Sequence, residues 1–433
     1  MNNSNNSRTI KLDYIARVEG EGSFHVKVRD GAVTESRLKI FEPPRFFEGF
    51  LQGRSFREAP DITARICGIC PVAYQMSSTH AMEKICGYTP HPAIRALRRL
   101  LYCGEWIESH ALHTFMLHVP DFLGYPDAIS MAKDHKEWVV KALALKKTGN
   151  DIVNILGGRE IHPINVKVGG FYRYPQPGDF AEIRDRLVKA QEIAHDAVKW
   201  MATLEFPDFT MDYEYVALHH SDEYPMNEGR LISNKGLNIG VEAYEEVFTE
   251  EHMPYSTTLH TSLHQDRIIH TGPLARFNLN FEQLPKEIRQ LARSIDLKPP
   301  VVNPFKSLLV RLIETVYACG EAIEIIDHYT YPGELNDTVV PKAGQGEAVT
   351  EAPRGILYHR YTIDSQGLIT KAKIVAPTSH NQRVIELDLR KVVEKFQSLD
   401  DKALTERCES TVRNYDPCIS CSTHFLNVII DRG

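Results

Sequence analysis

Four of the eight cysteines in this 433-residue chain form two Cys-x-x-Cys pairs near its opposite ends. The pairs are Cys67 with Cys70 and Cys418 with Cys421. Two intervening residues form a tight turn with both sulfurs on one side, so each pair can reach one metal ion. In a reducing compartment such pairs are more often metal ligands or redox groups than structural bridges. The spacing predicts a site on which four thiolates can converge.

Two other interpretations of the pairs are weaker but open. A structural four-thiolate zinc site usually joins its pairs across a short insert, whereas nearly the whole chain separates these. A dithiol of the thioredoxin type needs a βαβ context, which neither pair has. The remaining cysteines are interpreted as small buried apolar residues. They are Cys86, Cys103, Cys319 and Cys408.

The elements that must position the pairs are mostly helical. Apolar residues recur at three-to-four spacing over four long stretches, which predicts helices packed as a bundle. These stretches are 92–119, 126–156, 178–204 and 304–328. Alternating patterns predict a strand pair over 9–41 and strands again over 355–376. The predicted class is α+β, predominantly helical, with a central long-helix bundle and small sheets near both ends.

We expect one folded unit over 9–424 and no clean internal boundary. Within it lie an amino-terminal sheet over about 9–60, a helical body over about 61–350 and a carboxy-terminal sheet and helix part over about 351–424. Residues 1–8 are rich in Asn and Ser and are expected to form a disordered tail.

Composition excludes several classes of protein. Apolar residues make up 42% and charged residues 25%, as in an ordinary globular protein. The net charge is −7 and no basic block stands out, so nucleic acid is not expected as a partner. No apolar run is long enough for a membrane span, and the amino terminus lacks the apolar core of a signal peptide. We therefore expect a cytoplasmic location.

The residues around both pairs resemble the paired signatures of the nickel-iron hydrogenase large subunit. They read RICGICPV over 65–72 and DPCISCSTH over 416–424. The likeness extends through RVEG at 17–20, REIHP at 159–163 and APRG at 352–355. The resemblance implies a catalytic subunit that splits dihydrogen reversibly into protons and electrons. The alternative is a structural zinc or interaction subunit, similar to the respiratory-complex subunits related to this family.

The resemblance also implies the metal centre. A nickel would be bound by all four thiolates, and Cys70 and Cys421 would bridge to an iron that carries carbon monoxide and cyanide. Cys67 and Cys418 would be terminal nickel ligands. Independently of the resemblance, soft thiolates suit thiophilic metals, and their concentrated negative charge requires metal cations.

Other residues receive roles by their place in the family motifs. Glu19 would relay the proton that dihydrogen cleavage releases. Arg354, after Pro353, would place its guanidinium against one cyanide. Thr378 would provide a hydroxyl or backbone partner for the other cyanide. Asp416 would pair with Arg354 or cap a turn. A solvated glutamate at position 19 and ordinary surface roles for Arg354 and Thr378 are the alternatives.

A second metal site is implied by His424 and Glu48, completed by the backbone carbonyl of Ile374. In the family this cation is usually magnesium, and a carboxylate with an imidazole suits it. We expect a structural and proton-path role.

One departure from the family concerns the first cysteine pair. Many members place His four residues after its second cysteine, where this chain has Tyr74 followed by Gln75. The change should alter hydrogen bonding near a bridging sulfur. The pattern resembles the cytoplasmic, NADP-linked or sulfhydrogenase-type branch.

A second departure lies in the first predicted helix. Ser109 stands where many relatives carry a carboxylate. The histidines that follow, His110, His113 and His118, are interpreted as interior residues and not as ligands.

Electrons must leave through another polypeptide. The chain has no nucleotide-binding glycine fingerprint. Its other four cysteines are scattered singly and form no cluster of the kind that an iron-sulfur centre needs, with about four thiolates each. The resemblance implies an iron-sulfur small subunit, with flavin- and nicotinamide-binding diaphorase subunits that reach NADP or NAD. It also implies nickel-insertion factors and a maturation peptidase that removes residues 425–433.

Overall fold

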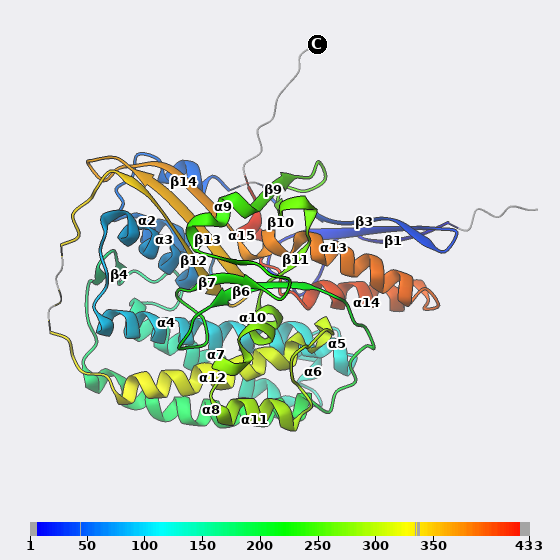
Figure 1. Cartoon of the computed structure of the whole chain (residues 1–433). Coiled ribbons are helices and arrows are strands. Elements are labelled where there is room, and N and C mark those ends of the chain that lie inside the picture. The colour runs from blue at the N-terminus through cyan, green and yellow to red at the C-terminus, as the bar shows by residue number, and fades with distance from the viewer. Residues whose placement is uncertain (1–6, 44, 334, 336–337, 425–433) are drawn as a thin grey trace, which may run out of the picture.

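Four long helices form the body of the protein. The computed structural model describes residues 7–43, 45–333, 335 and 338–424. The long helices are α4 (Pro92–Ala111), α7 (Lys136–Gly157), α8 (Ala181–Met201) and α12 (Ser307–Asp327). They pack side by side in the lower half of Figure 1, with α4 against α7 and α12, and α8 against α7 and α12. The predicted helical bundle and the α+β class are confirmed.

One predicted helical stretch is continuous, whereas another is interrupted. The stretch 92–119 continues from α4 into a π-helical segment (Leu112–His118) before α5 (Val119–Leu123) ends at Gly124, which has a positive φ of 75°. The stretch 126–156 is interrupted after α6 (Ala128–Met131), and α7 begins only at Lys136. Because apolar spacing continues across such breaks, the pattern alone does not reveal them.

The amino-terminal sheet has three antiparallel strands where a pair was predicted. Their order is β1 (Ser7–Leu12), β2 (Gly22–Arg29) and β3 (Ala32–Ile40). Because β1 begins at Ser7, the last two residues of the predicted tail belong to the sheet, and Arg8 pairs with Asp401 at 2.7 Å. Residues 1–6 of that tail and the predicted extension 425–433 lie outside the described residues.

The carboxy-terminal sheet is also three-stranded. Strands β12 (Gly344–Ala352), β13 (Gly355–Ile363) and β14 (Ile369–Val375) are antiparallel neighbours in that order. The pattern predicted the last two strands and missed β12. The tight turn between β12 and β13 consists of Pro353 and Arg354, so the sheet presents Arg354 at one end.

Further strands lie in the middle of the chain, where sequence analysis predicted only helices. One sheet has the order β11 (Ile269–His270), β6 (Glu214–His219), β7 (Arg230–Ser233) and β8 (Asn238–Ile239). A hairpin, β9 (Phe248–His252) with β10 (Leu259–Leu263), and a short pair, β4 (Val166–Lys167) with β5 (Gly170–Phe171), complete the strands. Strand β6 is buried along nearly its whole length, so it lacks the alternation that marks a half-exposed strand.

The two cysteine pairs lie at the starts of helices. Helix α3 (Pro71–Cys86) begins directly after Cys70, and α15 (Ile419–Ser422) begins after Cys418. The chain reaches the second pair through α13 (Pro377–Lys395) and α14 (Asp401–Arg413), next to the amino-terminal sheet in Figure 1. The remaining helices are α1 (Phe47–Leu51), α2 (Ala59–Thr63), α9 (Tyr244–Val247), α10 (Pro273–Asn280) and α11 (Lys286–Ser294). Over the described residues, every helix is too short or too polar to cross a bilayer.

Candidate metal centre

The four cysteine sulfurs of the two pairs converge. All four Sγ atoms lie within 4.8 Å of one another. Cys67 Sγ is 2.8 Å from Cys70 Sγ and 3.6 Å from Cys418 Sγ. Three of these cysteines are buried, Cys421 is half-buried, and all are free thiols. The other four cysteines are buried, as expected of small apolar residues.

Backbone amides hold each pair in place. The Sγ of Cys67 accepts hydrogen bonds from the backbone N–H groups of Ile69 and Cys70, at 3.3 and 3.0 Å. In the second pair, the Cys418 N–H donates to Thr378 Oγ1 at 2.9 Å. Thr378, at the start of α13, therefore supports the loop that carries a ligand candidate.

Crowding shifts the acidity of the thiols in opposite directions. Burial opposes ionisation of Cys67, but hydrogen bonds from the other three thiols and the charge of Arg354 hold its pKa well below the usual range. The pKa of Cys418 is raised well above its usual range, first by its hydrogen bond to Cys421. Burial raises the pKa of Cys421 to about 11. Four thiolates in this space therefore require bound cations, and soft, thiophilic metals fit this donor set.

Glu19 lies directly beside the second pair. Its Oε1 accepts a hydrogen bond from Ser420 Oγ at 2.5 Å, and its Oε2 accepts one from the Ser420 N–H at 3.1 Å. Its backbone carbonyl accepts a third from the Ile419 N–H at 2.9 Å. The carboxylate therefore contacts Ser420, one of the two residues between Cys418 and Cys421.

Arg354 is buried and paired with Asp416. Its Nε donates to the Asp416 backbone oxygen at 2.8 Å and lies 3.1 Å from Oδ2 of the same residue. Its Nη1 is buried and has no hydrogen-bond partner within the described part of the chain. Of the two roles predicted for Asp416, the structure shows the pairing. The unpartnered N–H group fits a small anionic ligand at the metal centre.

The residues expected to hold magnesium also lie together. His424 Nε2 is 3.1 Å from Glu48 Oε2, and the Ile374 N–H donates to Glu48 Oε1 at 2.7 Å. The three residues line one cavity of about 420 Å³ together with Cys421. Ile374 presents its N–H to the carboxylate, whereas its carbonyl was the expected ligand.

Helix α4 and its continuation place the three predicted interior histidines in polar contacts. His110 Nε2 lies 2.9 Å from a Glu314 oxygen, and His113 Nε2 lies 2.7 Å from the Arg413 carbonyl. His118 contacts Asp121 and Asn414. All three are buried and bonded to protein groups, which supports the prediction that they are not ligands.

The two departures from the family pattern are both buried. Tyr74 is fully buried, and within the described residues its hydroxyl has no hydrogen-bond partner, as is also true of the Ser109 hydroxyl. Gln75 Nε2 donates to the Pro163 carbonyl at 2.9 Å. Gln75 therefore ties α3 to the REIHP segment.

Comparison with known proteins decides the family. The sequence pattern of a family described as nickel-dependent hydrogenase matches residues 45–138 and 232–424, which include both cysteine pairs. The chain belongs to the nickel-dependent hydrogenase family. The resemblance seen in the sequence is thereby confirmed.

Relatives of this hydrogenase chain match it along nearly its whole length. The alpha subunits of sulfhydrogenase 2 and sulfhydrogenase 1 of Pyrococcus furiosus are 34% and 33% identical to it. Each match covers 97% of this chain, with 100% and 98% of the relatives. A crystal structure of an NAD⁺-reducing nickel-iron hydrogenase in its H₂-reduced state has a TM-score of 0.86 and 26% identity, covering 96% of this chain and 99% of that one. The chain is a hydrogenase catalytic subunit, an oxidoreductase acting on hydrogen.

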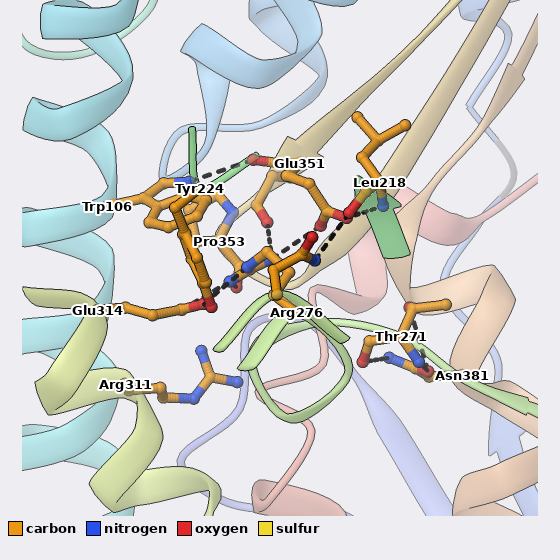
Figure 2. A network of polar contacts seen from close by, with 12 residues as sticks. Trp106, Leu218, Tyr224, Thr271, Arg276, Arg311, Glu314, Glu351, Pro353 and Asn381 are labelled. Atoms are coloured by element: carbon orange, nitrogen blue, oxygen red, sulfur yellow. Dashed lines mark hydrogen bonds and ion pairs between the residues drawn. The ribbon is translucent and has the colours of Figure 1, made fainter. Parts of the chain in front are cut away.

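Several buried charged residues of this hydrogenase, which hold the segments that carry the site residues, were not predicted from the sequence. Glu105 accepts hydrogen bonds from the N–H groups of Val72 and Ala73, at 2.6 and 3.2 Å, and so holds the start of α3. Its only signal in the sequence is its position inside an otherwise apolar run of α4. A second group surrounds Arg276, which contacts Glu314 and Glu351 (Figure 2). Charged residues are usually solvated, and none of these has a neighbouring residue pattern that marks it as buried, so the sequence alone does not single them out.

Proposed function

We propose that Cys67, Cys70, Cys418 and Cys421 bind nickel, and that Cys70 and Cys421 also bridge to an iron carrying carbon monoxide and cyanide. The main support for this proposal is that the four sulfurs, which come from both ends of the chain, lie within 4.8 Å of one another. A nickel-iron centre supplies the electron-accepting site at which dihydrogen is cleaved heterolytically. The protein supplies the thiolates, a base and the buried surroundings.

The proton leaves through Glu19 in this proposal. A carboxylate can accept a proton when it is within hydrogen-bonding reach of the proton's path. Glu19 meets this requirement through Ser420, which lies between the two cysteines of the second pair. The solvated alternative is disfavoured because both carboxylate oxygens are engaged inside the protein.

Arg354, Pro353, Thr378 and Asp416 orient the ligands of the iron. The free Nη1 of Arg354 is the donor we assign to one cyanide, and Asp416 fixes the guanidinium plane. Thr378, which already accepts from the Cys418 N–H, has a hydroxyl hydrogen to donate to the other cyanide.

Glu48, Ile374 and His424 hold magnesium in this proposal. The carboxylate and the imidazole lie 3.1 Å apart and share a cavity with Cys421. We assign the cation a structural role and a role in the proton path.

Electrons pass to an iron-sulfur small subunit and from there to diaphorase subunits that bind flavin and NADP or NAD. The subunit names of the relatives and the NAD⁺-reducing enzyme among the solved structures support this assignment. Nickel-insertion factors, removal of 425–433 by a peptidase and a cytoplasmic location complete the proposal.

Elemental analysis with infrared spectroscopy tests the proposal. Purified enzyme should contain nickel and iron and show bands of metal-bound carbonyl and cyanide. Zinc alone, without those bands, would support the structural alternative. The identity of the co-purifying subunits tests the electron path.

A further inference from the structure

The turn that carries Arg354 is packed tightly against the start of α10. A Cβ atom at Gly272 would lie 2.6 Å from the Arg354 carbonyl oxygen, and one at Gly355 would lie 2.5 Å from Thr271 Oγ1. Both glycines have positive φ angles, 100° and 142°. The Thr271 N–H is itself held by Asn381 Oδ1 at 2.9 Å. One side of the turn therefore has no room to move.

Arg276 of α10 holds the same turn through its carbonyl groups. Its Nη1 donates to the Ala352 oxygen and its Nη2 to the Pro353 oxygen, each at 2.9 Å. These are the two residues that precede Arg354. Figure 2 shows Arg276 with Pro353 and its two carboxylate partners, Glu314 and Glu351, around it.

The Arg276 guanidinium cannot swing away from the turn. Its Nε and Nη2 bind both oxygens of Glu314 at 2.8 Å, and its Nη1 binds Glu351 at 3.0 Å. The guanidinium also lies 4.3 Å from the centre of the Trp106 ring. Arg276, Glu314 and Glu351 are all fully buried, so solvent does not compete for these contacts.

The two carboxylates are fixed in turn by other parts of the protein. Glu314 accepts from the Tyr224 hydroxyl at 2.8 Å and Glu351 accepts from the Leu218 N–H at 2.8 Å. Arg311, one turn before Glu314 on α12, lies 3.6 Å from Asp416, the partner of Arg354. Helix α12 therefore contacts both Arg276, through Glu314, and Asp416, through Arg311.

We infer that Arg276 is a positioning residue for the reaction, which acts by fixing the Ala352–Pro353 backbone and thereby the direction of the Arg354 guanidinium. The inference rests on the function proposed for Arg354. A misplacement of about 1 Å by a residue outside the chemistry can cost on the order of 100-fold in rate. The hydrogen bonds from Arg276 to the carbonyl groups of two consecutive residues prevent such a misplacement of Arg354.

The competing explanation is a purely structural ion pair. Arg98 provides the comparison, because it is 1% exposed and binds both oxygens of Glu83 at 2.6 and 2.8 Å. Within the described residues, the hydrogen bonds of its guanidinium go to Glu83 and none goes to the Arg354 turn. Arg98→Lys is therefore the matched control for loss of a buried guanidinium.

Hydrogen exchange of the full-length chain before metal loading tests the positioning directly. We expect Arg276→Lys to accelerate exchange of the peptide covering 350–357 about tenfold, with exchange of α8 unchanged. Arg98→Lys should leave the 350–357 peptide unchanged. Arg276→Gln is the second variant if the lysine variant yields too little folded protein. Unchanged exchange at 350–357 in the folded Arg276 variant would overturn the inference, whatever the function of the site.

A double-mutant cycle on the metal-loaded enzyme complex tests the route through Arg354. Arg276→Lys should lower kcat about tenfold or more alone, and less than about twofold in an Arg354→Lys background. The infrared bands of the iron ligands should shift in both single variants. Equal losses in both backgrounds would overturn positioning through Arg354. If Arg354→Lys itself changes neither rate nor bands, the proposed role of Arg354 fails, and the exchange result still decides whether Arg276 holds the turn.

Discussion

The carboxylate of Glu19 binds both the hydroxyl and the backbone N–H of Ser420, a residue 401 positions later in the chain. This contact joins the segment before β2 to the loop of the second cysteine pair. The Ile419 N–H reinforces it by donating to the Glu19 carbonyl. The candidate base and two candidate metal ligands are therefore held as one unit.

Replacing Glu19 tests the proton relay. We expect Glu19→Gln to keep the metals, because the amide oxygen can still accept from Ser420, and to lose about 100- to 10,000-fold in dihydrogen turnover and hydrogen–deuterium exchange. Glu21→Gln, a change at an exposed position nearby, should have no effect. Unchanged turnover in Glu19→Gln would defeat the assignment.

Replacing a cysteine tests the metal ligands. Cys421→Ala removes one of four converging sulfurs, so we expect loss of nickel and iron and a loss of activity of at least about 100-fold, because changing even an outer-shell partner of a metal ligand costs about 10- to 100-fold. Metal content by elemental analysis is the measurement. Cys408→Ala, at a buried cysteine outside the quartet, should retain both metals. Equal metal loss in the two variants would argue against a specific ligand role.

Asp388 predicts a pH dependence of stability. It is fully buried and accepts from the Tyr213 and Tyr415 hydroxyls at 2.6 and 2.7 Å. Burial raises its pKa from 3.8 to about 7. A raised pKa means that the folded protein binds the proton more tightly, so this stability is present at low pH and is lost as the pH rises through about 7.

The Asp388→Asn variant has no ionisable group at this position, so its stability lacks this pH dependence. Relative to the unmodified chain, the variant should gain stability between about pH 5 and about pH 8, by at most roughly 3 kcal/mol. Chemical unfolding at the two pH values measures the difference. Tyr213→Phe serves as the comparison, because it removes one hydroxyl that favours the ionised carboxyl. A pH-independent difference between Asp388→Asn and the unmodified chain would contradict the prediction.

Processing predicts the mass of the carboxy-terminal peptide. In an active preparation we expect the chain to end at His424, because the resemblance to the family implies that a maturation peptidase removes 425–433. Mass spectrometry of the terminal peptide is the measurement, with metal-free chain as the comparison. Retention of Phe425 in fully active enzyme would refute processing.

The residues of the candidate site were easier to select from the sequence than the elements around them. The cysteine pairs, Glu19, Glu48 and His424 sit in short local motifs. The structure brings the four sulfurs together and places Glu48 beside His424 and Glu19 beside the second pair. Long amphipathic helices were predictable for the same reason, because their periodicity is local. Strand β6 and the interruption before α7 have no comparable local signal.

Arg276 shows why the supporting residues could not be predicted. Its hydrogen-bond partners lie 38 to 77 positions away and come from α12, the end of β12 and the turn that follows it. Seen alone, an arginine in the sequence PLARFNLN is indistinguishable from a solvated one. Only the packing of α10 against those elements buries it.

The two halves of the thiolate quartet lie 351 positions apart, measured from Cys67 to Cys418. An ion bound to both halves would act as a staple that closes most of the polypeptide into a ring. By the loop-entropy relation for cross-links, such a closure disfavours the unfolded chain by roughly 6 kcal/mol. Chelation should therefore lower the resistance of the whole subunit to heat and proteolysis, besides abolishing its catalysis.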